Sequence, residues 1–198
     1  MELLAANLKW KCSASACTSC CLLCLIVLVF TKPCLYAATF KPDQVKAAFI
    51  YNLTNFVTWP DSQSLGPERP IVIAVVGSQA IAHNLLLLTK GETLKGRPFY
   101  IKFIQSLSEI GDCQILFLDK SMEAPLGEML RDLARQGVLT IGDSPDFLKN
   151  GGMVGLLPKG KRIQIVINVD AARNAGISFN SKLLKVAKII RSIRGMGK

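Results

Sequence analysis

Apolar runs alternate with amphipathic segments along the chain from residue 43 onward. Four runs are predicted to be strands, over residues 71–76, 99–104, 113–118 and 138–141. The first of these, Ile-Val-Ile-Ala-Val-Val, is almost continuously β-branched, which is typical of a strand buried on both faces. Helical patterns at about residues 81–88 and 124–136 lie between the strands. This alternation predicts a single Rossmann-like α/β domain, with a mostly parallel central sheet and helices on both faces.

Further helices are predicted at both ends of this alternation. The first covers residues 43–59, and Pro60 ends it because the residue before a proline is pushed out of the α region. Its predicted apolar face, at steps of three and four, consists of Val45, Phe49, Leu53, Phe56 and Val57. Residues 170–175 are predicted to form a helical turn, and the last helix is predicted over residues 181–193.

Residues 138–168 combine a strand, a loop, a short helix and a hairpin. The signals are, in order, Gly142 after the strand, Asp143 or Ser144 as the helix cap, Pro145 at the first helical position, and Gly151 and Gly152 at the helix end. A turn at residues 158–161 then joins two strand-like runs into a C-terminal hairpin. The loop follows the carboxyl end of a strand, which is where α/β proteins place ligand-facing residues.

The first 38 residues differ from the rest of the chain. They hold six of the seven cysteines, embedded among apolar residues with no following fold to hold a metal. A basic stretch at residues 9–11 precedes an apolar run at residues 21–30, and small residues at 37–38 offer a cleavage site, as in a secretory signal peptide. The run is shorter than the roughly 20 residues of a spanning helix, so an uncleaved anchor is the less favoured alternative. We predict a signal peptide over residues 1–38 and an exported, periplasmic domain over residues 39–198.

The chain is strongly basic, with a net charge of +10. Removing the predicted leader leaves 21 basic and 13 acidic residues. This excess favours an acidic partner, an anionic membrane surface or an anionic polymer, although charge can also serve solubility alone.

Residues with catalytic or cofactor-binding chemistry are few. The single histidine, His83, excludes histidine-based triads and sites with several histidine ligands. Cys113 adjoins an apolar strand and is expected to be a packed, unreactive thiol. Gly77 after the first strand is not followed by the further glycines of a dinucleotide-binding loop, and a P-loop lysine is missing. We therefore predict no enzymatic activity, no cofactor, no metal and no nucleic-acid partner.

The remaining candidates are polar residues near strand ends. The candidate ligand-binding or partner-binding residues are Asp143, Ser144, Asn168, Arg173 and Arg97, and the candidate structural residues are Asn52, Trp59, Pro60, Gly142, Pro145, Gly151 and Gly152. Turn and cap chemistry explains many of them. The functional interpretations are a modest pocket for an anion or small ligand, or a protein-docking face.

Several of these motifs, taken in order, resemble the YfiR/HmsC-like periplasmic proteins. The motifs are Val45–Pro60 (VKAAFIYNLTNFVTWP), Lys95–Pro98 (KGRP), Cys113–Leu118 (CQILFL), Leu139–Pro145 (LTIGDSP), Gly151–Met153 (GGM), Ile167–Arg173 (INVDAAR) and Ser181–Leu184 (SKLL). Each motif alone is weak, but their order and spacing are specific, and together they cover roughly residues 43–190.

The resemblance implies an exported α/β regulator that binds the periplasmic domain of an inner-membrane diguanylate cyclase and holds it inactive. Cyclic-di-GMP, exopolysaccharide and biofilm formation would then fall. It also implies a homodimer, and release when an outer-membrane or peptidoglycan-associated protein sequesters the repressor. A periplasmic sensor of a small anion or amino acid, acting on another membrane partner, is the alternative.

This sequence departs from better-known members of that family at its cysteines. The resemblance implies one disulfide between the positions of Ala74 and Cys113 here, and a second near Leu148 and Gly155. Cys113 is the only cysteine beyond the leader, so neither bridge can form within the mature chain. Packing must replace the ~2–4 kcal/mol that a disulfide typically contributes.

Overall fold

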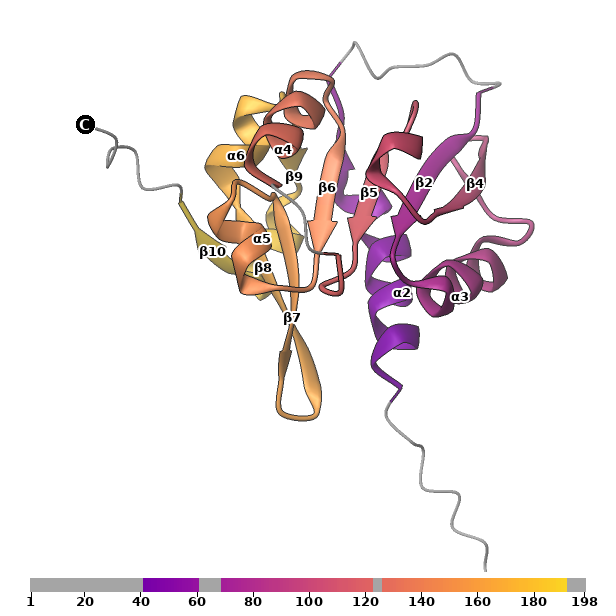
Figure 1. The fold of residues 1–198 in the computed structure, drawn as a ribbon, viewed down its shortest axis with the longest axis horizontal. Helices are drawn as coiled ribbons and strands as arrows, with labels where there is room; N and C mark the ends of the chain where they lie inside the picture. Colours follow the sequence, from indigo (N-terminus) through magenta and orange to yellow (C-terminus); the bar gives the residue numbers. More distant parts are fainter. Residues whose placement is uncertain (1–40, 61–68, 123–125, 192–198) are drawn as a thin grey trace, which may run out of the picture. The chain divides into compact units, whose positions relative to one another are not determined.

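The computed structural model describes residues 41–60, 69–122 and 126–191, and the predicted leader lies outside these residues. The described part contains an eight-stranded sheet with the order β10-β8-β7-β6-β5-β2-β4-β3, and a two-stranded sheet of β1 and β9 (Figure 1). Within the described part, no helix is long and apolar enough to cross a membrane.

The bounds of the elements agree closely with the apolar runs. The strands are β1 (Val57–Thr58), β2 (Ile71–Val76), β3 (Thr93–Leu94), β4 (Arg97–Ile104), β5 (Ile115–Leu118), β6 (Leu139–Gly142), β7 (Val154–Lys159), β8 (Arg162–Asn168), β9 (Ser178–Phe179) and β10 (Lys188–Ile190). The helices are α2 (Pro42–Leu53), α3 (Gln79–Thr89), α4 (Leu126–Arg135), α5 (Pro145–Lys149), α6 (Val169–Asn174) and α7 (Ser181–Val186), with single 3₁₀ turns at η1 (Thr54–Phe56) and η3 (Leu107–Glu109).

The central strands of the sheet are parallel. Strands β4, β2, β5, β6 and β7 pair in that order, all parallel, so their carboxyl ends meet at one edge of the sheet. Strand β8 returns antiparallel to β7 and forms the predicted hairpin, and β10 runs parallel to β8. The predicted Rossmann-like α/β class with a mostly parallel sheet is confirmed.

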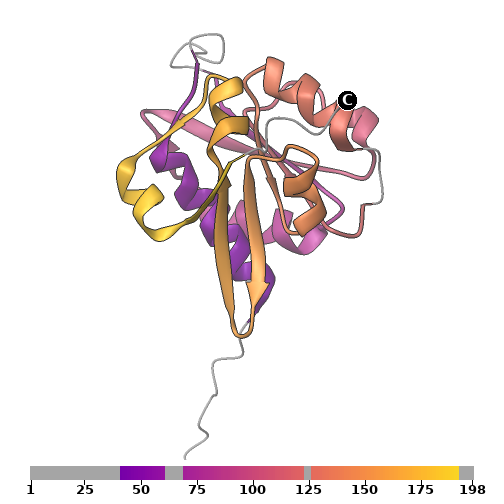
Figure 2. The same ribbon diagram turned by 90° about the vertical axis from the view of Figure 1, so that its left-hand side faces the viewer.

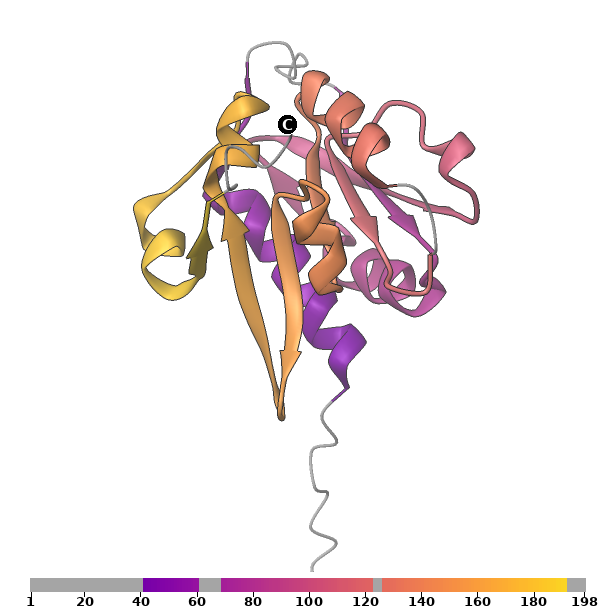
Figure 3. The same cartoon turned by 60° about the vertical axis from the view of Figure 1, so that its left-hand side comes forward.

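Two apolar clusters fill the spaces on the two faces of the sheet. On one face α2 and α3 cover side chains such as Ile73, Phe117 and Ile141, and α6 and α7 contribute to the same cluster. On the other face α4 and α5 cover the alternate side chains, including Leu116. The strands are therefore buried from both sides, as their continuous apolar sequences predict. Figures 2 and 3 show the helices on both sides of the sheet.

The first helix is shorter than predicted, and its most buried face is rotated from the predicted apolar face. It ends at Leu53, after which one 3₁₀ turn leads into β1, because β1 pairs with β9 and needs extended backbone. The buried side chains of α2 are Lys46, Ala47, Ile50 and Leu53. Of the predicted apolar face, Leu53 is fully buried, Phe49 is half-buried and packs against the core, and Val45 is only half-buried. A lysine occupies the buried face because a carboxylate meets it there.

The last predicted helix, over residues 181–193, is also wrong beyond its first turns. Helix α7 ends at Val186, and residues 188–190 form strand β10. Lys188 pairs with Val166 of β8, and Ile190 pairs with Asn168. The exposed edge of β8 provides hydrogen-bond partners that outweigh the local helical pattern.

Candidate functional site

A buried ion pair lies at the carboxyl edge of the parallel strands. Lys46 Nζ of α2 lies 2.6 Å from Oδ2 of Asp143, the residue after β6. The other carboxylate oxygen, Oδ1, accepts a hydrogen bond from the backbone N–H of Lys120, which follows β5, at 2.7 Å. The Asp143 side chain has no exposed surface and that of Lys46 is only 7% exposed. Asp143 therefore holds together α2 and the loops that follow β5 and β6.

The loop after Asp143 is built by capping and close packing. Ser144 Oγ accepts a hydrogen bond from the Phe147 N–H, and Pro145 is the first residue of α5, as predicted. A Cβ atom on Gly142 would lie 2.5 Å from the Phe147 ring, and one on Gly152 would lie 2.1 Å from it. Both glycines are thus required by the phenyl ring that lies between them. Gly151 has a φ of +100° and ends the helix.

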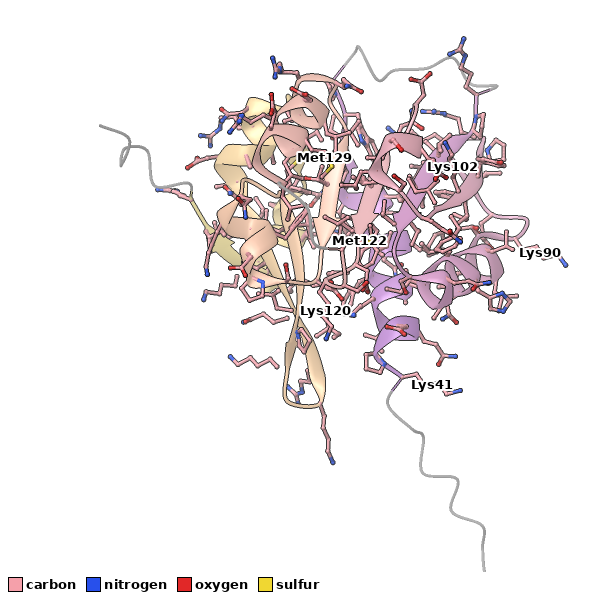
Figure 4. The ribbon with its side chains drawn as sticks, viewed as in Figure 1. Lys41, Lys90, Lys102, Lys120, Met122 and Met129 are labelled. Carbon is pink, nitrogen blue, oxygen red and sulfur yellow. The ribbon has the colours of Figure 1, made fainter. Side chains whose placement is uncertain are left out.

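The crevice between β2 and β5, where the strand order reverses, is filled by the chain itself. Open α/β sheets bind ligands at such points. Here a Cβ atom on Gly77, after β2, would lie 2.8 Å from Met122 Cγ and 3.2 Å from Asp119 Cβ. Met122 is labelled in Figure 4. The described residues also contain no group of three or more metal-ligating side chains. At this edge, side chains of the loop after β5 therefore pack closely against Gly77.

The other predicted site residues lie away from Asp143 and Ser144. Asn168, the last residue of β8, lies two strands away from β6, and the register places it level with Thr140, toward the amino end of β6 and not at the carboxyl edge. Asn168 is buried and caps α6, accepting a hydrogen bond from the Ala171 N–H. The Arg173 side chain is 78% exposed and lies 3.5 Å from Asp170. The structure therefore does not bring the candidate ligand-binding residues into one pocket.

A cavity of about 600 Å³ lies at the amino end of the parallel strands. Its lining includes Phe56, Trp59, Leu94, Arg97, Gln114 and Asn180. Arg97 donates hydrogen bonds to the carbonyl oxygens of Arg69 (2.7 Å) and Pro70 (3.1 Å), and burial lowers the pKa of its guanidinium. Trp59 Nε1 is buried here, and none of the described residues offers it a hydrogen-bond partner. This cavity joins three predicted residues, Arg97, Trp59 and Pro60, which the sequence did not link.

The remaining structural candidate, Asn52, serves its own helix. Asn52 Nδ2 donates to the carbonyl oxygen of Ala48 one turn earlier, at 2.8 Å, and the residue is exposed. Among the described residues, the side chain of Asn52 makes no hydrogen bond to the Lys46–Asp143 ion pair or to the residues that line the cavity.

Helix α3 carries exposed leucines that the sequence analysis assigned only to a helix. Leu86 and Leu87 are 57% and 61% exposed. They line a hollow of about 500 Å³ together with Pro98 and Phe99 at the start of β4. We call Leu86, Leu87, Pro98 and Phe99 the α3 patch. The signal in the sequence is the run of four leucines at residues 85–88. Successive side chains of an α-helix are rotated by about 100°, so four consecutive leucines cannot all face the core.

The comparisons with known proteins identify a family for this chain. The YfiR/HmsC-like family profile matches residues 43–188, which extend from α2 to the first residue of β10. The chain belongs to the YfiR/HmsC-like family. No curated protein matches the chain. Among solved structures, the ABC domain from Streptococcus pneumonia in complex with L-Trp is similar at 14% identity, over 75% of this chain and 60% of that one, with a TM-score of 0.49. That likeness is too low to carry a functional conclusion.

Packing occupies the positions at which the YfiR/HmsC-like resemblance implies disulfides. Leu148 lies over Gly155, where a Cβ atom would be 2.7 Å from Leu148 Cδ1. Ala74 and Cys113 are both buried in the same apolar cluster. Cys113 is a free thiol, and burial raises its pKa to about 12. The expectation that Cys113 is packed in the interior is confirmed.

Proposed function

We propose that this protein is an exported, non-enzymatic regulator, released from its 1–38 leader, that binds the periplasmic domain of an inner-membrane diguanylate cyclase. Binding holds the cyclase inactive, so cyclic-di-GMP, exopolysaccharide and biofilm formation fall. Membership of the YfiR/HmsC-like family over residues 43–188 supports this role.

The α3 patch is the structural observation that supports a function through binding to another protein. Exposed leucines beside a hollow form the kind of apolar surface that soluble domains bury against a partner. Leu86 and Leu87 offer aliphatic anchors, and Phe99 in the hollow is held by an edge-on ring contact with Tyr51, with ring centroids 5.6 Å apart. A fixed aromatic ring beside exposed aliphatic side chains is suited to contact with a protein partner.

A pull-down of the full chain with the purified periplasmic domain of the cognate cyclase tests this function. We expect the double variant Leu86→Ser/Leu87→Ser to bind at least about tenfold more weakly, since buried anchors dominate interface energies. Val186→Ser is the matched control, because Val186 is also apolar and is 76% exposed, but lies on α7. We expect this control to bind normally.

The proposal is wrong if the native chain fails to bind the cyclase domain and if deletion of its gene leaves cyclic-di-GMP unchanged. If the Leu86→Ser/Leu87→Ser variant binds normally, the docking surface lies elsewhere than the α3 patch.

Self-association and sequestration are further parts of the proposal. We expect a homodimer, and release of the cyclase when an outer-membrane or peptidoglycan-associated protein captures the regulator. Sedimentation analysis of the native chain and of the Leu86→Ser/Leu87→Ser variant tells whether a second copy uses the α3 patch. A variant that stays dimeric while losing the cyclase separates the two interfaces.

A small-ligand sensor is the second candidate, and the cavity around Trp59 and Arg97 favours it. Its lining combines aromatic side chains with a guanidinium, which suits a small anion or an amino acid. Thermal-shift screening of such compounds tests it, since a ligand at 100 times its dissociation constant adds about 2.7 kcal/mol of stability. A screen without shifts, together with normal signalling by Trp59→Phe and Arg97→Ala, removes the sensor.

A further inference from the structure

The β7–β8 hairpin projects beyond the edge of the central sheet. Strand β6 ends at Gly142, opposite Gly155 of β7, but β7 continues for four more residues to Lys159. On the other side, β10 pairs only with Val166–Asn168 of β8. Residues 156–165 therefore pair only with one another and extend about 13 Å past the sheet. Figures 1, 2 and 3 all show this projection, which we call the basic ribbon.

Three cations form the tip of the basic ribbon. Lys159, Lys161 and Arg162 are all exposed, and the described residues provide none of them with an ion-pair partner. Gly160, with a φ of +59°, forms the tight turn that brings them together. Lys159 lies directly opposite Arg162, a like-charge pair that weakens a hairpin. A cluster that costs stability and has no internal counter-ion is suited to an external anion.

The basic ribbon points in the same direction as the start of α2. Lys41 and Lys120, both exposed, lie on this side of the molecule (Figure 4). The carboxylates nearby already have partners within the chain: Asp43 with Lys46, Asp119 with the Ser121 N–H, Asp143 with Lys46, and Asp146 with Lys149. This end of the domain therefore presents a net positive surface.

We propose that the basic ribbon binds the surface of a membrane that contains anionic phospholipids. The charge of the ribbon and its apolar neighbours indicate this occupant. Its tip carries three exposed cations for which the described residues supply no ion-pair partner. The phosphate groups at the surface of an anionic bilayer complement that charge.

The composition of the basic ribbon also suits a headgroup layer. Behind the cations lie Pro158, which is exposed, and Leu157 and Ile163, which are half-buried. Apolar side chains next to lysine and arginine allow shallow contact with the interface while the charges bind phosphate. Each cation near an anionic surface strengthens binding about fivefold, so three contribute roughly a hundredfold. Salt weakens this attraction, because the Debye length is only about 8 Å at physiological ionic strength.

Vesicle sedimentation with the full chain tests the proposal. Vesicles of phosphatidylethanolamine with phosphatidylglycerol are compared with vesicles of phosphatidylcholine alone. We expect Lys159→Gln/Lys161→Gln/Arg162→Gln to bind the anionic vesicles roughly a hundredfold more weakly than the native chain, with no change on neutral vesicles. The leader is present in every variant, so its contribution cancels.

A matched control removes the same charge elsewhere. Lys182→Gln/Lys185→Gln/Lys188→Gln also removes three exposed lysines, from α7 and β10, and is expected to keep most of the anionic preference. Equal losses in both triple variants, or no preference of the native chain for anionic vesicles, would overturn the proposal. Ribbon-dependent capture of an acidic protein without vesicle binding would overturn it too. The cyclase pull-down is separate, so either proposal can fail alone.

Discussion

Lys46 and Asp143 lie 97 residues apart in the chain, yet Lys46 Nζ and Asp143 Oδ2 are separated by only 2.6 Å in the interior. The pair joins the first turns of α2 to the carboxyl edge of the sheet. Burying two charges is costly, and it is offset only when the pair has good geometry and further hydrogen bonds. The N–H of Lys120 supplies such a bond to Asp143 Oδ1. The contact therefore specifies how α2 is placed on the sheet.

Replacing Lys46 by methionine leaves the Asp143 carboxylate buried without a counter-ion. We expect Lys46→Met to lower the free energy of unfolding by about 3–5 kcal/mol, as measured by urea denaturation. Adding Asp143→Asn should recover part of this loss, because the buried group is then neutral.

Lys149→Met provides the control for that experiment. It breaks a lysine–aspartate pair of similar length, 2.8 Å, but both side chains are 75% exposed. Exposed pairs contribute less than about 1 kcal/mol, so the loss should be small. Similar losses for Lys46→Met and Lys149→Met would contradict a structural role for the buried pair.

The two glycines around Phe147 are expected to tolerate no side chain. Gly152→Ala should destabilise the domain by about 1–3 kcal/mol or more, because its Cβ would lie 2.1 Å from a phenyl ring that is itself buried. Gly127→Ala is the control: in α4 the nearest atoms would be 3.8 Å away, and alanine favours the helix by roughly 0.5–1 kcal/mol. Thermal melts should therefore move in opposite directions for the two variants.

A disulfide is expected to form where Leu148 now packs over Gly155. In Leu148→Cys/Gly155→Cys, the backbones are already close enough for the side chain at 148 to reach a Cβ at 155. The oxidised variant should gain about 2–4 kcal/mol over its own reduced form. Mass spectrometry counts the free thiols of the variant. A melting temperature that is the same with and without reductant would contradict the expected stabilisation by the disulfide.

Cys113 is expected to be unreactive in the folded protein. Its thiol is buried, and desolvation raises its pKa from 9.0 to about 12, so little thiolate exists near neutral pH. Alkylation mapped by mass spectrometry should modify position 113 only in denaturant. The unfolded thiol ionises near pH 9, so this group's stabilising contribution is present below pH 9 and is lost as pH rises toward about 12. Cys113→Ala should lack that part of the alkaline destabilisation.

Local signals in the sequence predicted much of the fold correctly. Strands β2, β5 and β6 were recognisable because a strand covered on both faces needs a continuous apolar run. The Ser144-Pro145 start and the Gly151-Gly152 end of α5 were recognisable because caps act within a few residues of each other. The candidate site was less predictable, since nothing local indicates that Asn168 caps α6 two strands away from Asp143.

The sequence by itself determined the α/β class, the order of the main elements and the caps, because these depend on periodicity and on near neighbours. Only the tertiary structure decided that Lys46 is buried, that residues 188–190 form a strand, and that the basic ribbon extends past the sheet. Each depends on a partner distant in the chain: Asp143 for the lysine, β8 for the last strand, and the early end of β6 for the ribbon. Long-range pairing overrides local preference when it supplies a charge or a hydrogen bond that the segment cannot provide for itself.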